Sequence, residues 1–334
     1  MSDGTRAVDS DNVWTTLITN LSYLPGLLTL HYSLVVRAKS RYPLVALYTD
    51  AFPEEGLAAL RARGIPHQRI EDSEEEEEEE ENQYPNDPRF NDCWTKLAPF
   101  SLVQYSRIVQ LDSDMLCLQN MDELFDLPLS SSPSSSSTSG SLSPDDTEDT
   151  GYIFAAGHAC TCNPLSLPHY PPSWTPASCA FTAFHSSPDS AQTEGGNVGP
   201  LGYLNGGLTV VVPSLEHYRS ILNYMHTNGK NLDFADQSLL SDLFKGQWMT
   251  LPYIYNALKT MRWKGVHDKI WRDGEVKCLH YILTPKPWEE EVDEKTGKII
   301  GKGGRVDETH QWWVDINSER KKWEETKRVV RDGW

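Results

Sequence analysis

Short apolar runs alternate with segments of helical spacing along the first part of the chain. Residues 13–19 and 44–48 are apolar runs of the kind that fills a buried strand. Between them, 23–38 places its leucines on one helical face, and 54–63 predicts a second helix that ends at Gly64. Strands that alternate with helices predict βαβ units and a mostly parallel sheet, so the chain is expected to be an α/β protein.

The same alternation continues through the rest of the chain. Residues 94–106 predict a helix that leads into an apolar strand ending at residue 111. Further strands are expected at 153–156 and 208–212, and from 278 to near His280, because these runs are short and apolar. Near the C-terminus, the tryptophans of a charged segment are spaced for a helix that packs on the body of the protein.

Two polar stretches interrupt this pattern and define the expected domain organisation. The glutamate run within 71–83 repels itself, and 130–150 is rich in serine and acidic residues, so both are predicted to be disordered surface insertions. One domain is expected over 12–290. A polar segment (1–11) precedes it and a charged, aromatic helical extension (291–334) follows it.

Composition narrows the classes of function. The 334 residues carry a formal charge of −18, and ten of the acidic residues lie within 71–81. The chain has no basic stripe that would indicate nucleic-acid binding. It has neither an apolar segment long enough to span a membrane nor an N-terminal signal-peptide pattern, so a cytoplasmic location with mostly reduced cysteines is expected.

Two carboxylates one residue apart follow the predicted strand that ends at residue 111. Burying unpaired charge is costly, so Asp112 and Asp114 are expected at the carboxyl end of the strand, where open α/β sheets bind ligands. Carboxylate oxygens suit Mn²⁺ or Mg²⁺, which commonly bridge protein carboxylates to substrate phosphates. Asp-x-Asp also occurs in solvated turns, so residues elsewhere in the chain must decide between a metal site and a turn.

Polar residues at other element ends are further candidates. Asn205 precedes two glycines that permit close backbone approach or a positive φ, although a simple turn is an alternative. Asp236 and Gln237 open an apolar helical stretch, where they either face a substrate or only cap the helix. His280 ends a predicted strand and is a candidate third metal ligand. Lys286 can meet a phosphate as a point charge.

A loose group of cysteines and histidines lies between residues 158 and 179. Its members are His158, Cys160, Cys162, His169 and Cys179. Their spacing differs from that of standard zinc motifs, so a loop of buried thiols is favoured over zinc. The sequence contains no G-x-S-x-G, Walker or G-x-G-x-x-G motif, which disfavours hydrolase, P-loop and dinucleotide-binding functions.

Taken in order, the motifs resemble those of glycosyltransferase family 8, the retaining family of glycogenin and galactinol synthase. The resemblance covers roughly residues 12–290 outside the two insertions. The segments that carry it are 17–20, 95–97, LDSD at 111–114, LNGG at 204–207, 236–237, and His280 followed by KPW at 286–288.

This resemblance implies a GT-A fold, a Rossmann-like and mostly parallel sheet flanked by helices, and it assigns roles to the candidate residues. The implied ligands of Mn²⁺ (or Mg²⁺) on the diphosphate of a UDP-sugar are Asp112, Asp114 and His280. The residues implied to bind the UDP moiety are Leu17, Thr19, Asn20 and Tyr23 at the uridine, and Lys286 at a phosphate. Those implied at the donor sugar are Lys96, Ser113, Asn205, Asp236 and Gln237.

Within the family, the galactinol synthase subgroup is the more similar. Residues 123–128, 234–237 and 255–258 carry this likeness, and Trp263 stands near the place of the tyrosine that glycogenin glucosylates in itself. Between His280 and Lys286 the family often has a glycine, which is missing here.

The expected activity is Mn²⁺-dependent transfer of galactose or glucose from its UDP-sugar to a hydroxyl group, with retained anomeric configuration. The acceptor stays open between inositol, a glycan and a protein, and a homodimer is also left open. The alternatives are a glycogenin-like self-glucosylating primer and a non-catalytic nucleotide-sugar-binding protein.

Overall fold

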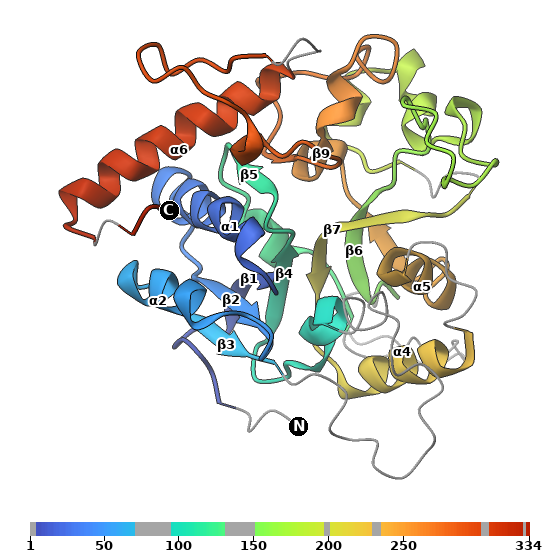
Figure 1. Ribbon diagram of the computed structural model, residues 1–334. Coiled ribbons are helices and arrows are strands. Elements are labelled where there is room, and N and C mark those ends of the chain that lie inside the picture. Colours follow the sequence, from blue (N-terminus) through green and yellow to red (C-terminus); the bar gives the residue numbers. More distant parts are fainter. Residues whose placement is uncertain are drawn as a thin grey trace.

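The protein is described by a computed structural model over residues 5–70, 95–130, 151–196, 201–228, 235–301, 307–329 and 332–334 (Figure 1). The acidic insertion predicted at 71–83, and all but the first residue of the Ser-rich stretch predicted at 130–150, lie outside these ranges. Within them, every helix is too short or too polar to cross a lipid bilayer.

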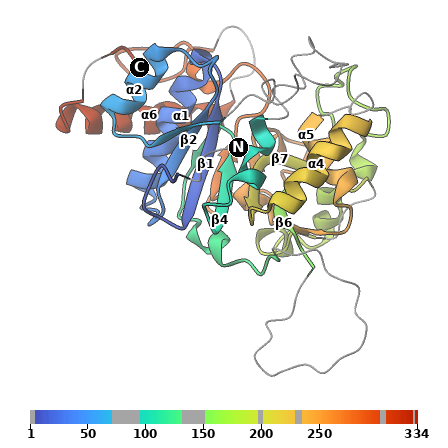
Figure 2. The same cartoon turned by 90° about the horizontal axis from the view of Figure 1, so that it is seen from below.

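A seven-stranded sheet forms the centre of the molecule, in the order β3-β2-β1-β4-β7-β6-β8 (Figures 1 and 2). Its strands are β1 (Asn12–Ile18), β2 (Leu44–Tyr48), β3 (His67–Arg69), β4 (Arg107–Leu111), β6 (Phe154–His158), β7 (Leu204–Val211) and β8 (Trp248–Thr250). β7 runs antiparallel to its neighbours β4 and β6, and the other pairs are parallel. The predicted α/β class and mostly parallel sheet are confirmed.

Helices from the N-terminal part cover one face of this sheet. α1 (Leu24–His31) continues into the π-helical segment η2 (Tyr32–Arg37), and α2 (Glu54–Ala62) lies beside them. Successive strand residues point to opposite faces. The strand residues on this face belong to two apolar clusters. One cluster includes Leu30 and Leu34 of the segment formed by α1 and η2, and the other includes Ala59 and Leu60 of α2. Burial of this face explains the helical spacing found in the sequence.

The opposite face is covered by α4 (Leu215–Asn228) and α5 (Ala235–Leu243), at the right of Figure 1. Phe154 and Val211 share an apolar cluster with Ile221 and Leu239 of these helices. Ala155, the neighbour of Phe154, belongs instead to the cluster under η2. This alternation shows that both faces of the sheet are buried, as expected for strands with continuous apolar runs.

A second sheet of three short strands stands beyond the carboxyl end of β4. Its order is β5-β10-β9, with β5 (Met115–Cys117), β10 (Cys278–His280) and β9 (Ala257–Leu258). β10 pairs antiparallel with β5, so that His280 lies opposite Met115. This pairing brings a segment near the C-terminus beside the residues that follow β4.

One sequence expectation was wrong in detail, and one open question is answered. Helical backbone covers 95–97 and the 3-10 segment Ala98–Ser101, rather than the whole of 94–106. The chain then turns into β4, and the Ser106 N–H donates to the carbonyl of Asp11 at 2.7 Å. The segment 204–207, which the sequence left open between close backbone approach and a simple turn, forms the first half of β7, beside a bulge in β6.

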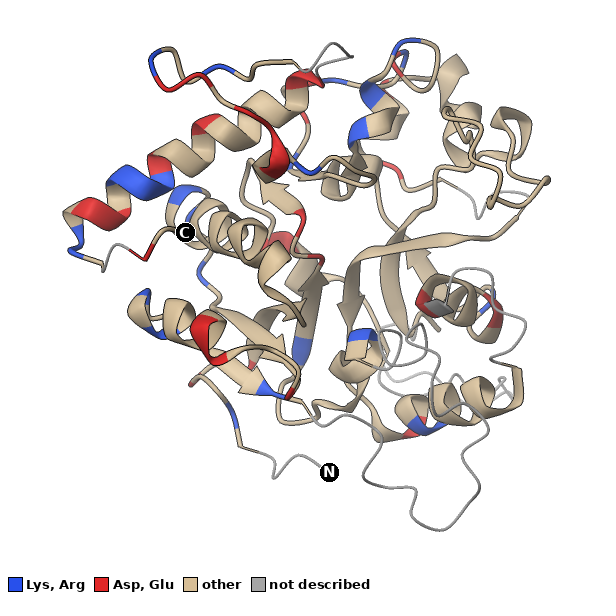
Figure 3. Cartoon of the chain, in the orientation of Figure 1, with Lys and Arg blue, Asp and Glu red and all other residues tan. Residues whose placement is uncertain are grey.

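The C-terminal helix α6 (Glu308–Thr326) packs across α1, as Figure 1 shows at the upper left. Asn317 accepts a hydrogen bond from Thr29 at 3.1 Å, and Trp323 packs against Tyr32 with ring centroids 5.7 Å apart. Figure 3 shows charges of both signs along this helix. The extension is therefore anchored to the body by its apolar and polar contacts.

A buried ion network holds the end of α6. The Glu324 carboxylate accepts hydrogen bonds from Arg320 at 2.6 Å and from Arg63 at 3.0 Å. Arg63 also forms an ion pair with Asp332 at 2.7 Å. The two arginine side chains are only 1% and 4% exposed, so each needs its partner.

We expect Glu324→Ala to lower the free energy of unfolding by about 3–5 kcal/mol, because it leaves two buried guanidinium groups without their shared carboxylate. Glu319→Ala on the same helix is the matched control. Glu319 makes an exposed ion pair with Arg37, and its loss should cost less than about 1 kcal/mol. Denaturant unfolding measures both variants, and equal losses would contradict the assignment of the network as a structural anchor.

Candidate active site

The two aspartates predicted as ligands follow β4 in a turn that leads directly into β5. The Asp112 N–H donates to the carbonyl of Gly207 at 2.8 Å, and the Tyr281 N–H donates to the carbonyl of Asp114 at 3.0 Å. These bonds tie the turn to β7 on one side and to the segment after β10 on the other. The carboxylates therefore lie at the carboxyl end of a parallel strand, as expected.

His280 joins the two aspartates because of the register between β5 and β10. Its Nε2 atom lies 3.3 Å from Asp114 Oδ1 and 3.7 Å from Asp112 Oδ2. One ligand atom from each of the three side chains lies within 4.8 Å of the others. The sequence had suggested this triad, and the structure brings its members together.

The orientation of His280 is set by Asn256. The Nδ1 atom of His280 lies 2.9 Å from Asn256 Oδ1, and the Asn256 amide donates to Asn205 Oδ1 at 2.8 Å. With Nδ1–H donating to Asn256, the lone pair of Nε2 points at the two carboxylates. Two anions and an imidazole lone pair that converge on one point fit a divalent cation well.

Lys286 lies against the same carboxylate from the other side. Its buried ammonium donates to Asp114 Oδ2 at 2.6 Å and to the Tyr281 carbonyl at 2.7 Å. Burial opposes the ionisation of Asp114, but without a cation a protonated His280, together with Lys286, holds the pKa of that carboxyl well below its usual range. Asp114 therefore carries its charge at any physiological pH.

Lys96 connects Asp112 with Asp236. Its ammonium lies 3.0 Å from Asp112 Oδ1 and 3.7 Å from Asp236 Oδ2. Although burial disfavours the charge, these two carboxylates raise the pKa of Lys96 well above its ordinary value. Burial raises the pKa of Asp236, against the opposing pull of Lys96. The lysine thus balances two acids that would otherwise repel each other.

The two glycines after Asn205 let neighbouring side chains lie close to the backbone. A methyl group on Gly206 would lie 2.5 Å from Asp236 Oδ2, and one on Gly207 would lie 2.3 Å from Cε1 of His280. The Gly206 N–H donates to Gln237 Oε1 at 3.1 Å. Asn205, Asp236 and Gln237 thereby meet around the start of β7, and the alternative of a simple turn does not apply to this segment.

The residues expected around the uridine lie along the end of β1 and the start of α1. The register pairs Thr16 with Leu111, which places Leu17 level with Asp112. Tyr23 packs against Trp288 with ring centroids 5.7 Å apart, and its ring lies 5.8 Å from the Lys286 ammonium.

Asn20 and Ser113 have local structural contacts as well. The Asn20 side chain accepts from the Ser22 N–H at 3.1 Å and caps the short 3-10 helix Leu21–Tyr23. A methyl group on Gly26 would lie 2.4 Å from the Ser113 carbonyl, so α1 begins directly against the Asp112–Asp114 turn. Thr19 follows β1 between these contacts and is partly exposed.

The loop between His280 and Lys286 keeps a glycine-like conformation without a glycine. Leu283 has a φ of 66°, in the left-handed region. The buried Lys259 donates to the Pro285 carbonyl at 3.2 Å, and its ammonium lies 2.9 Å from His310 Nε2 in α6. Burial lowers the pKa of Lys259 to about 8. Lys259 and Asn256 support the site, and neither was among the predicted site residues.

The family model described as glycosyl transferase family 8 matches residues 15–292. The chain belongs to glycosyltransferase family 8. The family match spans every predicted site residue, and the resemblance found in the sequence is confirmed. The chain is accordingly a glycosyltransferase.

Curated relatives of this family 8 chain include plant enzymes. It is 27% identical over 321 residues to galactinol synthase 1 of Arabidopsis thaliana, covering 91% of this chain and 78% of that protein. It is 28% identical over 291 residues to galactinol synthase 2 of Solanum lycopersicum, covering 83% of this chain and 71% of that protein.

Solved structures show the same fold at lower identity. The glycosyltransferase GlyE of Streptococcus pneumoniae aligns with a TM-score of 0.54 and 15% identity over 98% of this chain and 66% of that one. The galactosyltransferase LgtC, solved with donor and acceptor sugar analogues, aligns with a TM-score of 0.53 and 14% identity over 91% of this chain and 95% of that one. The predicted GT-A fold is confirmed.

Proposed function

We propose that this family 8 enzyme is a retaining, galactinol synthase-like hexosyltransferase that moves galactose or glucose from a UDP-sugar to a hydroxyl acceptor. The observation that carries the proposal is the convergence of Asp112, Asp114 and His280 beside Lys286 at the carboxyl end of β4. The similarity to plant galactinol synthases supports it independently. A catalytic domain over 12–290 with an extension at 291–334, and a cytoplasmic location, stay predictions.

In this proposal, Asp112, Asp114 and His280 hold the cation, for which Mn²⁺ or Mg²⁺ fits the oxygen-rich ligand set. When bound, the ion would neutralise charge on the diphosphate of the leaving UDP. Lys286 would stabilise the same charge through a hydrogen bond to a phosphate oxygen. Leu17, Thr19, Asn20 and Tyr23 would surround the uridine. Tyr23 lies near the Lys286 ammonium, which supports a continuous nucleotide site.

The donor sugar would lie between the metal site and the start of β7. Lys96, Ser113, Asn205, Asp236 and Gln237 would contact its hydroxyl groups. The C1–O bond to UDP would break on the face that the acceptor hydroxyl attacks, which retains the anomeric configuration. The acceptor proton would pass to the leaving phosphate.

Asp236 is the competing nucleophile for a double displacement. Its ion pair with Lys96 supports a role in holding the sugar rather than in attacking C1. Mass spectrometry of Asp236-containing peptides, after rapid quenching with a slow fluorinated donor, tests this choice. A covalent hexosyl group on Asp236 would overturn the same-face reaction.

The activity test is a matrix of UDP-galactose and UDP-glucose against inositol, an oligosaccharide and no acceptor, each with Mn²⁺. We expect release of UDP with one donor and formation of a hexosylated acceptor. Binding of UDP without turnover would indicate a non-catalytic protein. Hexoses added to the chain itself would indicate a glycogenin-like primer, against which Trp263 argues, because it stands near the place of the tyrosine that glycogenin glucosylates in itself.

Gly207→Ala is expected to displace His280 and lower turnover by about 10²-fold, because a misplacement of roughly 1 Å has this effect in active sites. The added methyl group would lie 2.3 Å from Cε1 of a side chain that Asn256 holds in place. Gly274→Ala is the matched control, since no atom of the described residues lies within 4 Å of the position that its added methyl group would take. Steady-state assays compare the two variants, and equal activity would contradict the role of close approach at Gly207.

A further inference from the structure

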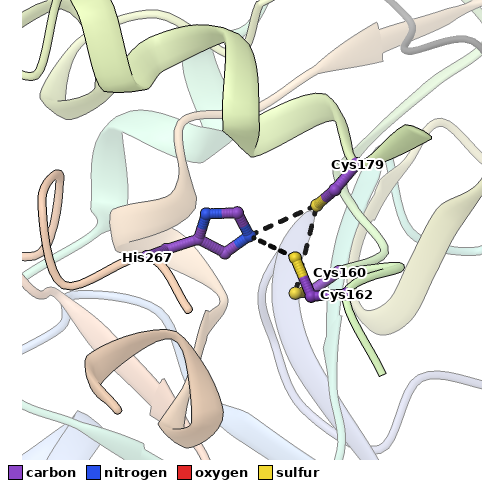
Figure 4. A group of neighbouring side chains, drawn as sticks. All are labelled: Cys160, Cys162, Cys179 and His267. Carbon is purple, nitrogen blue, oxygen red and sulfur yellow. Dashed lines mark hydrogen bonds between the residues drawn. The ribbon is translucent and has the colours of Figure 1, made fainter. Parts of the chain in front are cut away.

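Four side chains outside the candidate active site converge on one point. They are Cys160 and Cys162 after β6, Cys179 between two short 3-10 helices, and His267 in the loop after Lys259–Arg262 (Figure 4). Three of them belong to the cysteine group noted in the sequence. His267 lies 88 residues beyond Cys179 and completes the group only through the fold.

The distances lie within about 0.3 Å of those in a tetrahedral zinc site. Nε2 of His267 lies 3.2 Å from Cys162 Sγ and 3.3 Å from Cys179 Sγ, and Cys179 Sγ lies 4.0 Å from Cys160 Sγ. Four ligands placed tetrahedrally at standard Zn–S and Zn–N lengths stand about 3.5–3.8 Å apart. All four ligand atoms fall within 4.8 Å of one another, so a single small ion can contact them all.

The other nitrogen of His267 is held as a metal-binding histidine requires. Nδ1 of His267 lies 2.9 Å from Nε2 of His185, so an Nδ1–H donor directs the Nε2 lone pair toward the sulfurs. The His267 side chain is completely buried. His158 and His169, which the sequence grouped with the cysteines, instead contact aromatic rings.

The segment that carries the three cysteines has little regular secondary structure, so a cross-link would stabilise it. Between β6 and β7, the described residues form only three short 3-10 helices: Pro176–Ser178, Ala180–Ser186 and Ser190–Gln192. Thiols are weak hydrogen-bond donors, so three of them around an imidazole stabilise a loop little without an ion. The 4.0 Å separation of Cys160 and Cys179 is far longer than a disulfide bond of about 2.05 Å.

We infer that Cys160, Cys162, Cys179 and His267 bind one structural Zn²⁺. Three sulfur ligands favour zinc over the oxygen-preferring Mn²⁺ or Mg²⁺. Four protein ligands close the coordination shell, which is typical of a structural rather than a catalytic site. The ion would join 160–179 to the loop that carries His267. The first of these segments begins beside β7, where the Ala159 N–H donates to the Tyr203 carbonyl at 3.1 Å.

The first test measures metal content in the full chain, purified from zinc-supplemented cells under mild reduction. Elemental analysis should find about one zinc per chain, and X-ray absorption should show three sulfurs and one nitrogen, with Zn–S near 2.3 Å. Zinc below about a tenth of an equivalent, or a Cys160–Cys179 disulfide in peptide maps, would overturn the inference. A zinc shell of oxygen and nitrogen would overturn it as well.

Variants then locate the zinc. Cys162→Ser/Cys179→Ser should lose it, whereas Cys117→Ala, which removes a buried thiol outside the group, should retain it. Asp112→Asn should also retain it, which separates this site from the Asp112–Asp114–His280 group. Full zinc retention in the double variant would contradict the assignment. Because the absorption spectrum is taken on the wild-type chain, failure of a variant to fold does not remove the test.

Discussion

Asp112→Asn is expected to lower hexosyl transfer by about 10²–10³-fold while the chain stays folded. The substitution removes one anionic ligand from the Asp112–Asp114–His280 group, and lost stabilisation of leaving-group charge typically has an effect of this size. Asp112 is the better position than Asp114 for this test. Its side chain is 21% exposed, and Lys96 keeps Asp236 as a partner when Asp112 loses its charge.

Two comparisons make this experiment specific. Asp242→Asn changes an exposed aspartate of α5, near Asp236 in sequence, and should leave turnover unchanged. Asp114→Asn should lose activity and also stability, because it leaves the buried ammonium of Lys286 without its carboxylate. Assays at increasing Mn²⁺, together with thermal unfolding, measure both properties. Wild-type turnover in Asp112→Asn would contradict the metal assignment.

Lys286→Ala is expected to weaken UDP binding by roughly 10-fold or more while uridine binding changes little. A charged hydrogen bond to a phosphate is worth about 1.5–3 kcal/mol, and uridine has no phosphate to lose. Isothermal titration with UDP and with uridine, both at saturating Mn²⁺, separates the contribution of the phosphates to binding from that of the uridine.

The control for this variant is Lys277→Ala. Lys277 pairs with Glu123 away from the metal-ligand group, and its loss should change neither affinity. Equal weakening of UDP and uridine binding in Lys286→Ala would mean that the lysine only supports the fold of the 281–286 loop. That outcome would remove Lys286 from the proposed diphosphate site.

The central strands were predictable because their apolar runs are long enough to stand out. The strands at 44–48 and 107–111 are buried on both faces. Strands of this kind read as near-continuous apolar runs, which made them recognisable in the sequence. β9, in contrast, has two residues and carries no such signal. Asn256, which precedes it and orients His280, was noted only within the 255–258 likeness and not as a site residue.

Candidate site residues could be proposed from the sequence where a motif marked them and not where the fold alone assembles them. The ordered motifs around Asp112, Asn205 and His280 indicated one site from the sequence alone. His267 has no neighbouring cysteine in the sequence, so the spacing of the cysteines pointed away from zinc. His267 reaches the three cysteines only because the loop after Lys259–Arg262 packs against 160–179.

The proposed reaction is tested most directly by the product of the wild-type chain. The chain is passed through a chelator, supplied with UDP-galactose or UDP-glucose and an acceptor such as inositol, and assayed before and after Mn²⁺ is restored. The expected result is equimolar UDP and hexosylated acceptor only with the metal, with an α-linkage by NMR from an α-configured donor. A β-linked product, or no UDP from either donor with a correctly folded chain, would contradict the proposed retaining transfer.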